Sequence, residues 1–143
     1  MDLKRATWIG VVTYIISFIL GISIMYLLGI DPSQGSELPN SVLYINIIIT
    51  IIVAGFFTWF YFKVKTGKGV KVKPSAKEGA LFGVVLIIVG FILDLIIFGI
   101  SSVATDVEQN IIKYYSNPLF WVALVLFLIT TTVVGHILKK VKK

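Results

Sequence analysis

The stretch Lys77–Gly99, KEGALFGVVLIIVGFILDLIIFG, decides the class of this protein. It is apolar almost throughout, and it is long enough to cross a bilayer, since about 20 helical residues span a hydrocarbon core of about 30 Å. Asp94 lies well inside it. A carboxylate is costly within a membrane, so the stretch predicts a transmembrane helix with one polar position whose role has to be explained.

Three further apolar runs accompany this one in a chain of 143 residues, of which 57% are hydrophobic and 14% are charged. The expected spans are residues 6–30, 42–62, 79–100 and 119–138. Within lipid every backbone polar group must be paired inside its own segment, which makes each run a helix. Because the connecting loops are short, we predict an all-α fold, a four-helix transmembrane bundle that forms a single integral membrane domain over residues 1–143.

Basic residues gather on one side of this four-span layout. Twelve of the thirteen Lys and Arg residues precede the first span, lie between the second and third spans, or follow the fourth span, and Lys113 is the remaining one. Positive residues accumulate in cytoplasmic loops. We therefore expect a multi-pass protein of the cell membrane with its N- and C-termini in the cytoplasm.

The loop between the second and third spans is rich in lysine. Each basic residue near an anionic leaflet contributes about 1 kcal/mol to membrane binding. We expect a solvated loop that enforces topology. The alternatives are a small β-hairpin with a glycine-containing turn and an extended segment that contacts anionic lipids on the cytoplasmic face. The candidate contacts are Lys63, Lys65, Lys68, Lys71 and Lys73.

Aromatic residues cluster near the ends of the spans, as they do at membrane interfaces. We expect them to anchor the helices at the level of the lipid headgroups. The inner set is Trp8, Trp59 and Tyr61, and the outer set is Tyr26, Tyr44, Tyr114, Tyr115 and Trp121.

Small residues repeat on one face of the first span and on one face of the third. At about 100° per residue, the glycines of the third span fall in the same sector as Asp94. Small residues let helix backbones approach each other in lipid. We expect both faces to lie in the interior of the bundle, with contact between the two as one arrangement. The candidate packing residues are Gly10, Ser17, Gly21, Gly79, Gly83 and Gly90.

The polar residues of the second and third spans lie at similar depth. Asp94 is about six residues, or about 9 Å, below the outer end of its span, and Asn46 is about five residues below the outer end of its own. We predict an intramembrane polar site of Asp94, Asn46 and Thr50 in the outer leaflet. In this site Asp94 and Asn46 are expected to be within direct or water-mediated hydrogen-bond reach.

Three states of Asp94 fit the sequence, because no Lys or Arg lies within the expected spans. In the first state the side chain is a neutral acid that joins two helices through hydrogen bonds. Alternatively, it lines a wet cavity that opens to the outside, where it titrates. In the third state it is ionised against a basic residue of another protein.

The sequence offers little for catalysis. It has no cysteine, and its one histidine, His136, lies near the cytoplasmic end of the fourth span, far in depth from Asp94. We expect no enzyme, no cofactor, no metal site and no nucleic-acid partner. The first hypothesis is a non-enzymatic accessory or assembly subunit in a homo-oligomer or larger membrane complex. The alternative is a small transporter, channel or lipid-handling protein that uses Asp94 and Asn46.

The third span also carries a short pattern of letters: Lys77-Glu78-Gly79, then Gly83, then Leu93-Asp94. In this pattern the chain resembles a family of uncharacterised prokaryotic four-helix integral membrane proteins. The resemblance implies the four-helix fold and a prokaryotic source, and it implies no activity.

Overall fold

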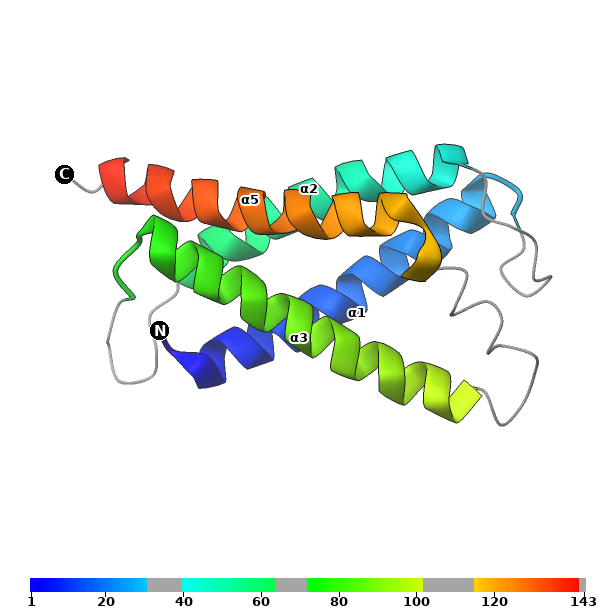
Figure 1. Ribbon diagram of the computed structural model, residues 1–143, viewed down its shortest axis with the longest axis horizontal. Helices are drawn as coiled ribbons and strands as arrows, with labels where there is room; N and C mark the ends of the chain where they lie inside the picture. The colour runs from blue at the N-terminus through cyan, green and yellow to red at the C-terminus, as the bar shows by residue number, and fades with distance from the viewer. Residues whose placement is uncertain (31–39, 64–71, 102–114, 142–143) are drawn as a thin grey trace.

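The computed structural model describes residues 1–30, 40–63, 72–101 and 115–141. Its helices are α1 (Leu3–Leu27), α2 (Asn40–Lys63), α3 (Ala76–Ser101) and α5 (Pro118–Val141) (Figure 1). Each of these four helices is long and apolar enough to span a membrane, and the described residues confirm the predicted all-helical fold. The start of α1 and the end of α5 lie at the same end of the bundle.

The helix ends differ from the predicted bounds because capping groups lie outside the apolar runs. Every helix begins before the expected residue, and α1 also ends earlier, at Leu27. The carboxylate of Asp2 accepts a hydrogen bond from the backbone N–H of Arg5 at 3.1 Å and so caps the start of α1. At the other end Gly29 adopts a φ of 70°, and the N–H groups of Gly29 and Ile30 bond back to carbonyls of the last turn. This left-handed glycine terminates the helix.

The four helices pack in the cyclic order α1, α3, α5, α2, so that each has two close neighbours. In Figure 1 α3 and α5 lie in front, with α1 and α2 behind them. The helices α2 and α3 therefore lie across the diagonal of the bundle and touch only weakly. Residues on these two helices can share a depth in the membrane without being in contact.

The main cluster of buried apolar residues lies in one half of the bundle. It draws on the first half of α1 and α3 and on the second half of α2, which all lie toward the end that contains the N-terminus. Toward the other end α3 spreads away from α5 (Figure 1). The core residues are Ala6, Ile9, Val53, Phe57, Tyr61, Phe62, Phe82 and Leu86.

Close backbone contact holds α3 and α5 together at the end with the core. A Cβ added to Gly135 would lie 3.1 Å from the Cα of Gly79, and one added to Gly79 would overlap the carbonyl oxygen of Thr131. A Cβ on Gly83 would meet the Thr131 hydroxyl and would lie 3.1 Å from Leu128. The glycines Gly79 and Gly83 of α3 thus face α5, and Gly135 of α5 completes a contact that small residues make possible.

The other small residues, Gly10 and Gly21 of α1 and Gly90 of α3, have more varied surroundings. A Cβ added to Gly10 would lie 3.2 Å from Leu86 and 3.3 Å from Val89, so this glycine sits against α3. At Gly90 the nearest atom would be Cδ2 of Tyr14 at 3.9 Å, and at Gly21 there is nothing within 4 Å. The two small-residue faces therefore do not form one continuous contact, since α3 divides its glycines between α5 and α1.

Candidate functional site

Asp94 is held by two tyrosine hydroxyls. Tyr14 of α1 donates to its Oδ1 at 2.5 Å, and Tyr115, in the helical turn before α5, donates to its Oδ2 at 2.8 Å. An ionised carboxylate only accepts hydrogen bonds and offers about four lone-pair sites. The tyrosines occupy two of these sites, and they join three separate segments of the chain at one side chain.

The crossing of α1 and α3 sets the register of this contact. Gly10 lets the two helices approach closely at Leu86 and Val89. Both helices run in the same direction from the end with the core. Tyr14 lies about one turn of 3.6 residues beyond Gly10 on α1, and Asp94 lies five residues beyond Val89 on α3. The tyrosine therefore reaches the carboxylate because glycine occupies the crossing point one turn earlier.

A pocket of about 150 Å³ lies beside this carboxylate, between α1, α3 and α5. It opens partly to the outside of the bundle, and its wall is mainly apolar. Asp94 is the charged residue among the described residues that line it. The lining consists of Gly10, Thr13, Tyr14, Ser17, Leu86, Ile87, Gly90, Phe91, Asp94, Phe120, Leu124 and Phe127.

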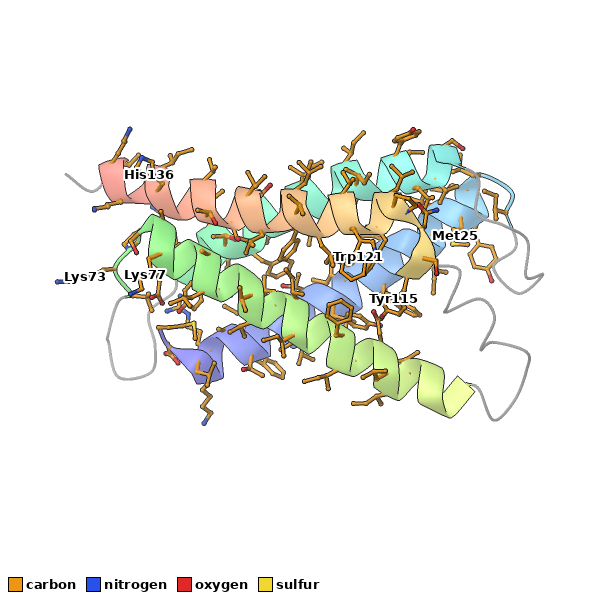
Figure 2. All side chains as sticks on the ribbon, in the orientation of Figure 1. Met25, Lys73, Lys77, Tyr115, Trp121 and His136 are labelled. Atoms are coloured by element: carbon orange, nitrogen blue, oxygen red, sulfur yellow. The ribbon has the colours of Figure 1, made fainter. Side chains whose placement is uncertain are left out.

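Aromatic rings surround the polar end of the pocket. Phe91 stacks on Tyr115 with 5.8 Å between ring centroids, and Phe120 packs edge-on against Tyr115 at 5.0 Å. The indole Nε1 of Trp121 donates to the carbonyl of Tyr115 at 2.9 Å and so fixes the turn that carries it. Tyr115 and Trp121 lie at the end of the bundle opposite Lys73, Lys77 and His136 (Figure 2). The hydroxyl of Tyr115 is thus aimed at Asp94 by a packed aromatic cluster.

Asn117 directly follows this turn and caps the start of α5. Its Oδ1 accepts from the backbone N–H of Leu119 at 2.9 Å, and Pro118 is the first residue of the helix. Asn at the cap followed by Pro at the first position is a favoured helix start. The cap therefore fixes where α5 begins relative to Tyr115.

The described hydrogen-bond partners of Asp94 are tyrosines, and a water-mediated link to Asn46 stays a prediction. Asn46 and Thr50 lie half-buried on α2, and neither belongs to the lining of the pocket. No direct hydrogen bond joins Asn46 to Asp94 among the residues that the structure describes. The reason is the helix order, since α2 lies across the diagonal from α3.

Sequence reasoning missed the two tyrosines that bind Asp94. Tyr14 stands four residues after Gly10 and three before Ser17, so helical spacing puts it on the same face as the small residues. The hydroxyl of Tyr14 on that face could have indicated a hydrogen bond to a polar residue of a neighbouring helix. Tyr115 was assigned to an interfacial belt, but its hydroxyl is bonded to Asp94 instead.

A second polar cluster lies at the end with the core and centres on Tyr61, which is 0% exposed. Its hydroxyl donates to Oε1 of Glu78 at 2.8 Å and accepts from the backbone N–H of Asp2 at 3.1 Å. Its ring stacks on Phe82 at 4.3 Å, and the guanidinium of Arg5 lies 5.0 Å from its centroid. The prediction that Tyr61 is an interfacial anchor is therefore wrong, because it ties α1, α2 and α3 together.

The lysines that are candidates for contact with anionic lipid are described only in part. Lys63 and Lys73 are exposed, and the ammonium of Lys63 lies 5.9 Å from the ring centroid of Trp59. Lys65, Lys68 and Lys71 lie outside the described residues.

Comparison of the chain with protein-family models, with curated proteins and with solved structures finds no match in any of the three. The resemblance to four-helix prokaryotic membrane proteins therefore stays a prediction.

Proposed function

We propose that this chain is a non-enzymatic multi-pass protein of the cell membrane that binds a small lipophilic ligand between α1, α3 and α5. Its function would be that of a lipid-handling protein or a small transporter. One observation carries the proposal: an apolar pocket of about 150 Å³ with Asp94 at its polar end. Ligand sites have this character, since they are concave, mostly apolar, and equipped with a few placed polar groups.

The volume of the pocket limits what it can enclose. Drug-sized ligands occupy pockets of about 300–1,000 Å³. An apolar cavity of about 150 Å³ accepts a molecule the size of benzene. The pocket therefore suits a small molecule, or one end of a longer molecule whose remainder extends into lipid through the opening.

The proposed orientation places both termini in the cytoplasm. It rests on the twelve basic residues that share one side of the four-span layout. Lys73 and Lys77, at the end of the bundle with the core, are exposed. With that end inside, the pocket would lie in the outer leaflet, where a ligand would enter sideways from the bilayer.

Substitution of Gly90 tests the ligand site. Gly90 lines the pocket, and a Cβ there meets only the ring of Tyr14 at 3.9 Å, so Gly90→Leu fills the cavity without a backbone clash. Thermal unfolding of the purified chain in detergent is measured with increasing concentrations of propylbenzene. We expect the melting temperature of the wild type to rise, and that of Gly90→Leu to stay constant. Gly21→Leu is the matched control, because it adds the same side chain where nothing lies within 4 Å. Equal responses of all three proteins would refute the site.

A second candidate function is that of an assembly subunit. It is favoured by Gly21, whose surroundings within 4 Å are empty although it belongs to the small-residue face of α1. Such faces bring helices together in membranes. Light scattering in mild detergent measures the mass of the complex. A homo-oligomer that Gly21→Leu dissociates would support this function, and a wild-type monomer would count against a homo-oligomer.

A further inference from the structure

We infer that the ligand of this pocket is a free lipophilic ammonium cation, with its positive group at Asp94 and its apolar body along the pocket wall. The inference rests on the proposed ligand site and adds the chemical class of the ligand. It arises from three features of the site: its charge, its aromatic rings and its depth.

No described residue of the pocket lining balances the charge of Asp94. Asp94 accepts from Tyr14 and Tyr115, which are neutral donors, and about two lone-pair sites remain. Among the described lining residues none is basic. Asp94 is half-buried at a depth that we propose lies within the bilayer, and in a medium of low dielectric constant a charge is costly unless it is paired. A cationic ligand supplies the pairing that these neutral donors do not.

Aromatic rings line the space where the cation would lie. Tyr14, Phe91 and Phe120 belong to the pocket wall, and Phe91 and Phe120 pack against each other at 6.3 Å. The faces of aromatic rings attract cations, and cages of such rings recognise quaternary ammonium groups. A carboxylate beside several rings therefore favours an ammonium group over an anionic or uncharged polar group.

The depth of Asp94 separates a free amine from a lipid headgroup. Asp94 stands seven residues before the last residue of α3, Ser101, which corresponds to about 10 Å along the helix axis. The ammonium of a phospholipid remains at the headgroup level. A small amine that partitions into the bilayer can reach this depth, and Leu86, Leu124 and Phe127 offer its body an apolar wall.

A matched pair of probes tests the inference. Benzyltrimethylammonium and neopentylbenzene have the same shape, but the first carries a quaternary nitrogen where the second has a carbon atom. Dissociation constants are measured by calorimetry on the full chain in a maltoside detergent without phospholipid. We expect the cation to bind at least about tenfold more tightly than the neutral probe. Asp94→Asn keeps the shape of the side chain and should abolish this preference while it leaves the neutral probe bound.

The outcomes separate this inference from the proposed function. Equal affinities of the two probes for the wild type, both lost in Gly90→Leu, would overturn the cation and keep the ligand site. Binding of neither probe would overturn both. The comparison of probes in the wild type stands even if Asp94→Asn fails to fold.

Two further arms address other sources of the positive charge. Phosphatidylcholine added to the detergent should not displace benzyltrimethylammonium, and displacement would assign the site to a lipid headgroup. Lys113→Gln changes a residue outside the described part of the chain and should bind the cation as the wild type does. A cation preference found in this variant alone would overturn the inference, because a base of the same chain would then neutralise Asp94.

Discussion

The hydroxyl of Tyr14 donates to Oδ1 of Asp94 over 2.5 Å and so joins residues that stand 80 positions apart. The bond links α1 to α3 just beyond the point where Gly10 lets these helices cross. It lies beyond the main cluster of buried apolar residues. Polar contacts also link the start of the chain to α3 at the other end, where the N-terminal amine pairs with Glu78 at 3.3 Å.

Tyr14→Phe should therefore lower the free energy of unfolding by about 1 kcal/mol, the size of a side-chain hydrogen bond within a membrane protein. The ring of Tyr14 stacks on Phe18 with 6.3 Å between centroids, and the phenylalanine keeps this contact. Unfolding by titration with sodium dodecyl sulfate measures the change.

The control for Tyr14→Phe is the same substitution in a protein that already carries Asp94→Leu. In an Asp94→Leu protein, Tyr14→Phe should cost less stability than in the wild type, because the bond to Asp94 no longer contributes. Tyr44→Phe removes a hydroxyl from a side chain that is 56% exposed, and it should leave stability unchanged. An equal loss in both backgrounds would show that the Tyr14 hydroxyl acts through another partner.

The spans could be predicted from the sequence because hydropathy is a local property of each segment. The order of helices around the bundle is not local, and the partner of Asp94 depends on it. Asn46 and Asp94 were matched by depth, but α2 and α3 lie across the diagonal. The start of α3 could be predicted from the sequence, since Ser75-Ala76-Lys77-Glu78 is a capping-box pattern. In the structure the Ser75 hydroxyl accepts from the N–H of Glu78 at 3.0 Å.

Whether an aromatic residue near a helix end is exposed or buried could also not be predicted from the sequence. Trp8, Trp59 and Tyr61 all fall at inner ends, yet Trp8 is 68% exposed and Tyr61 is fully buried. The rotation of each helix about its axis decides between these outcomes. That rotation follows from contacts such as Gly79 with Gly135, for which the sequence gives no pairing.

Gly79→Ala should destabilise the protein by about 1–3 kcal/mol, because extra volume in a packed contact forces the backbone to move. The added methyl group would overlap the carbonyl oxygen of Thr131, which belongs to the backbone and cannot turn away. Gly21→Ala is the control, and its stability should stay the same or rise by up to about 1 kcal/mol, as alanine is the better helix former. The same detergent titration compares the two variants. Equal stability of both would mean that α3 and α5 are farther apart than described.

Tyr61→Phe should cost about 1–3 kcal/mol, since it leaves a carboxylate oxygen of Glu78 and the N–H of Asp2 without the partner that both share. The stacking of the ring on Phe82 survives the change. Glu78 also pairs with the N-terminal amine at 3.3 Å, so Glu78→Gln has a cost of its own. The two changes together should still cost less than the sum of their separate effects, because both act on the bond from the Tyr61 hydroxyl. Full additivity of the two changes would contradict the coupling of Tyr61 to Glu78.

The orientation of the chain can be tested with single cysteines, because the natural sequence contains none. Lys73 and Ser116 are exposed, and Ser116 directly follows Tyr115, which lies at the end of the bundle opposite Lys73 (Figure 2). If the end with the core faces the cytoplasm, a membrane-impermeant maleimide applied to intact cells should label Ser116→Cys and spare Lys73→Cys. Lysis should make both sites reactive, which controls for accessibility. Labelling of Lys73→Cys alone in intact cells would invert the topology and would place the Asp94 pocket in the inner leaflet.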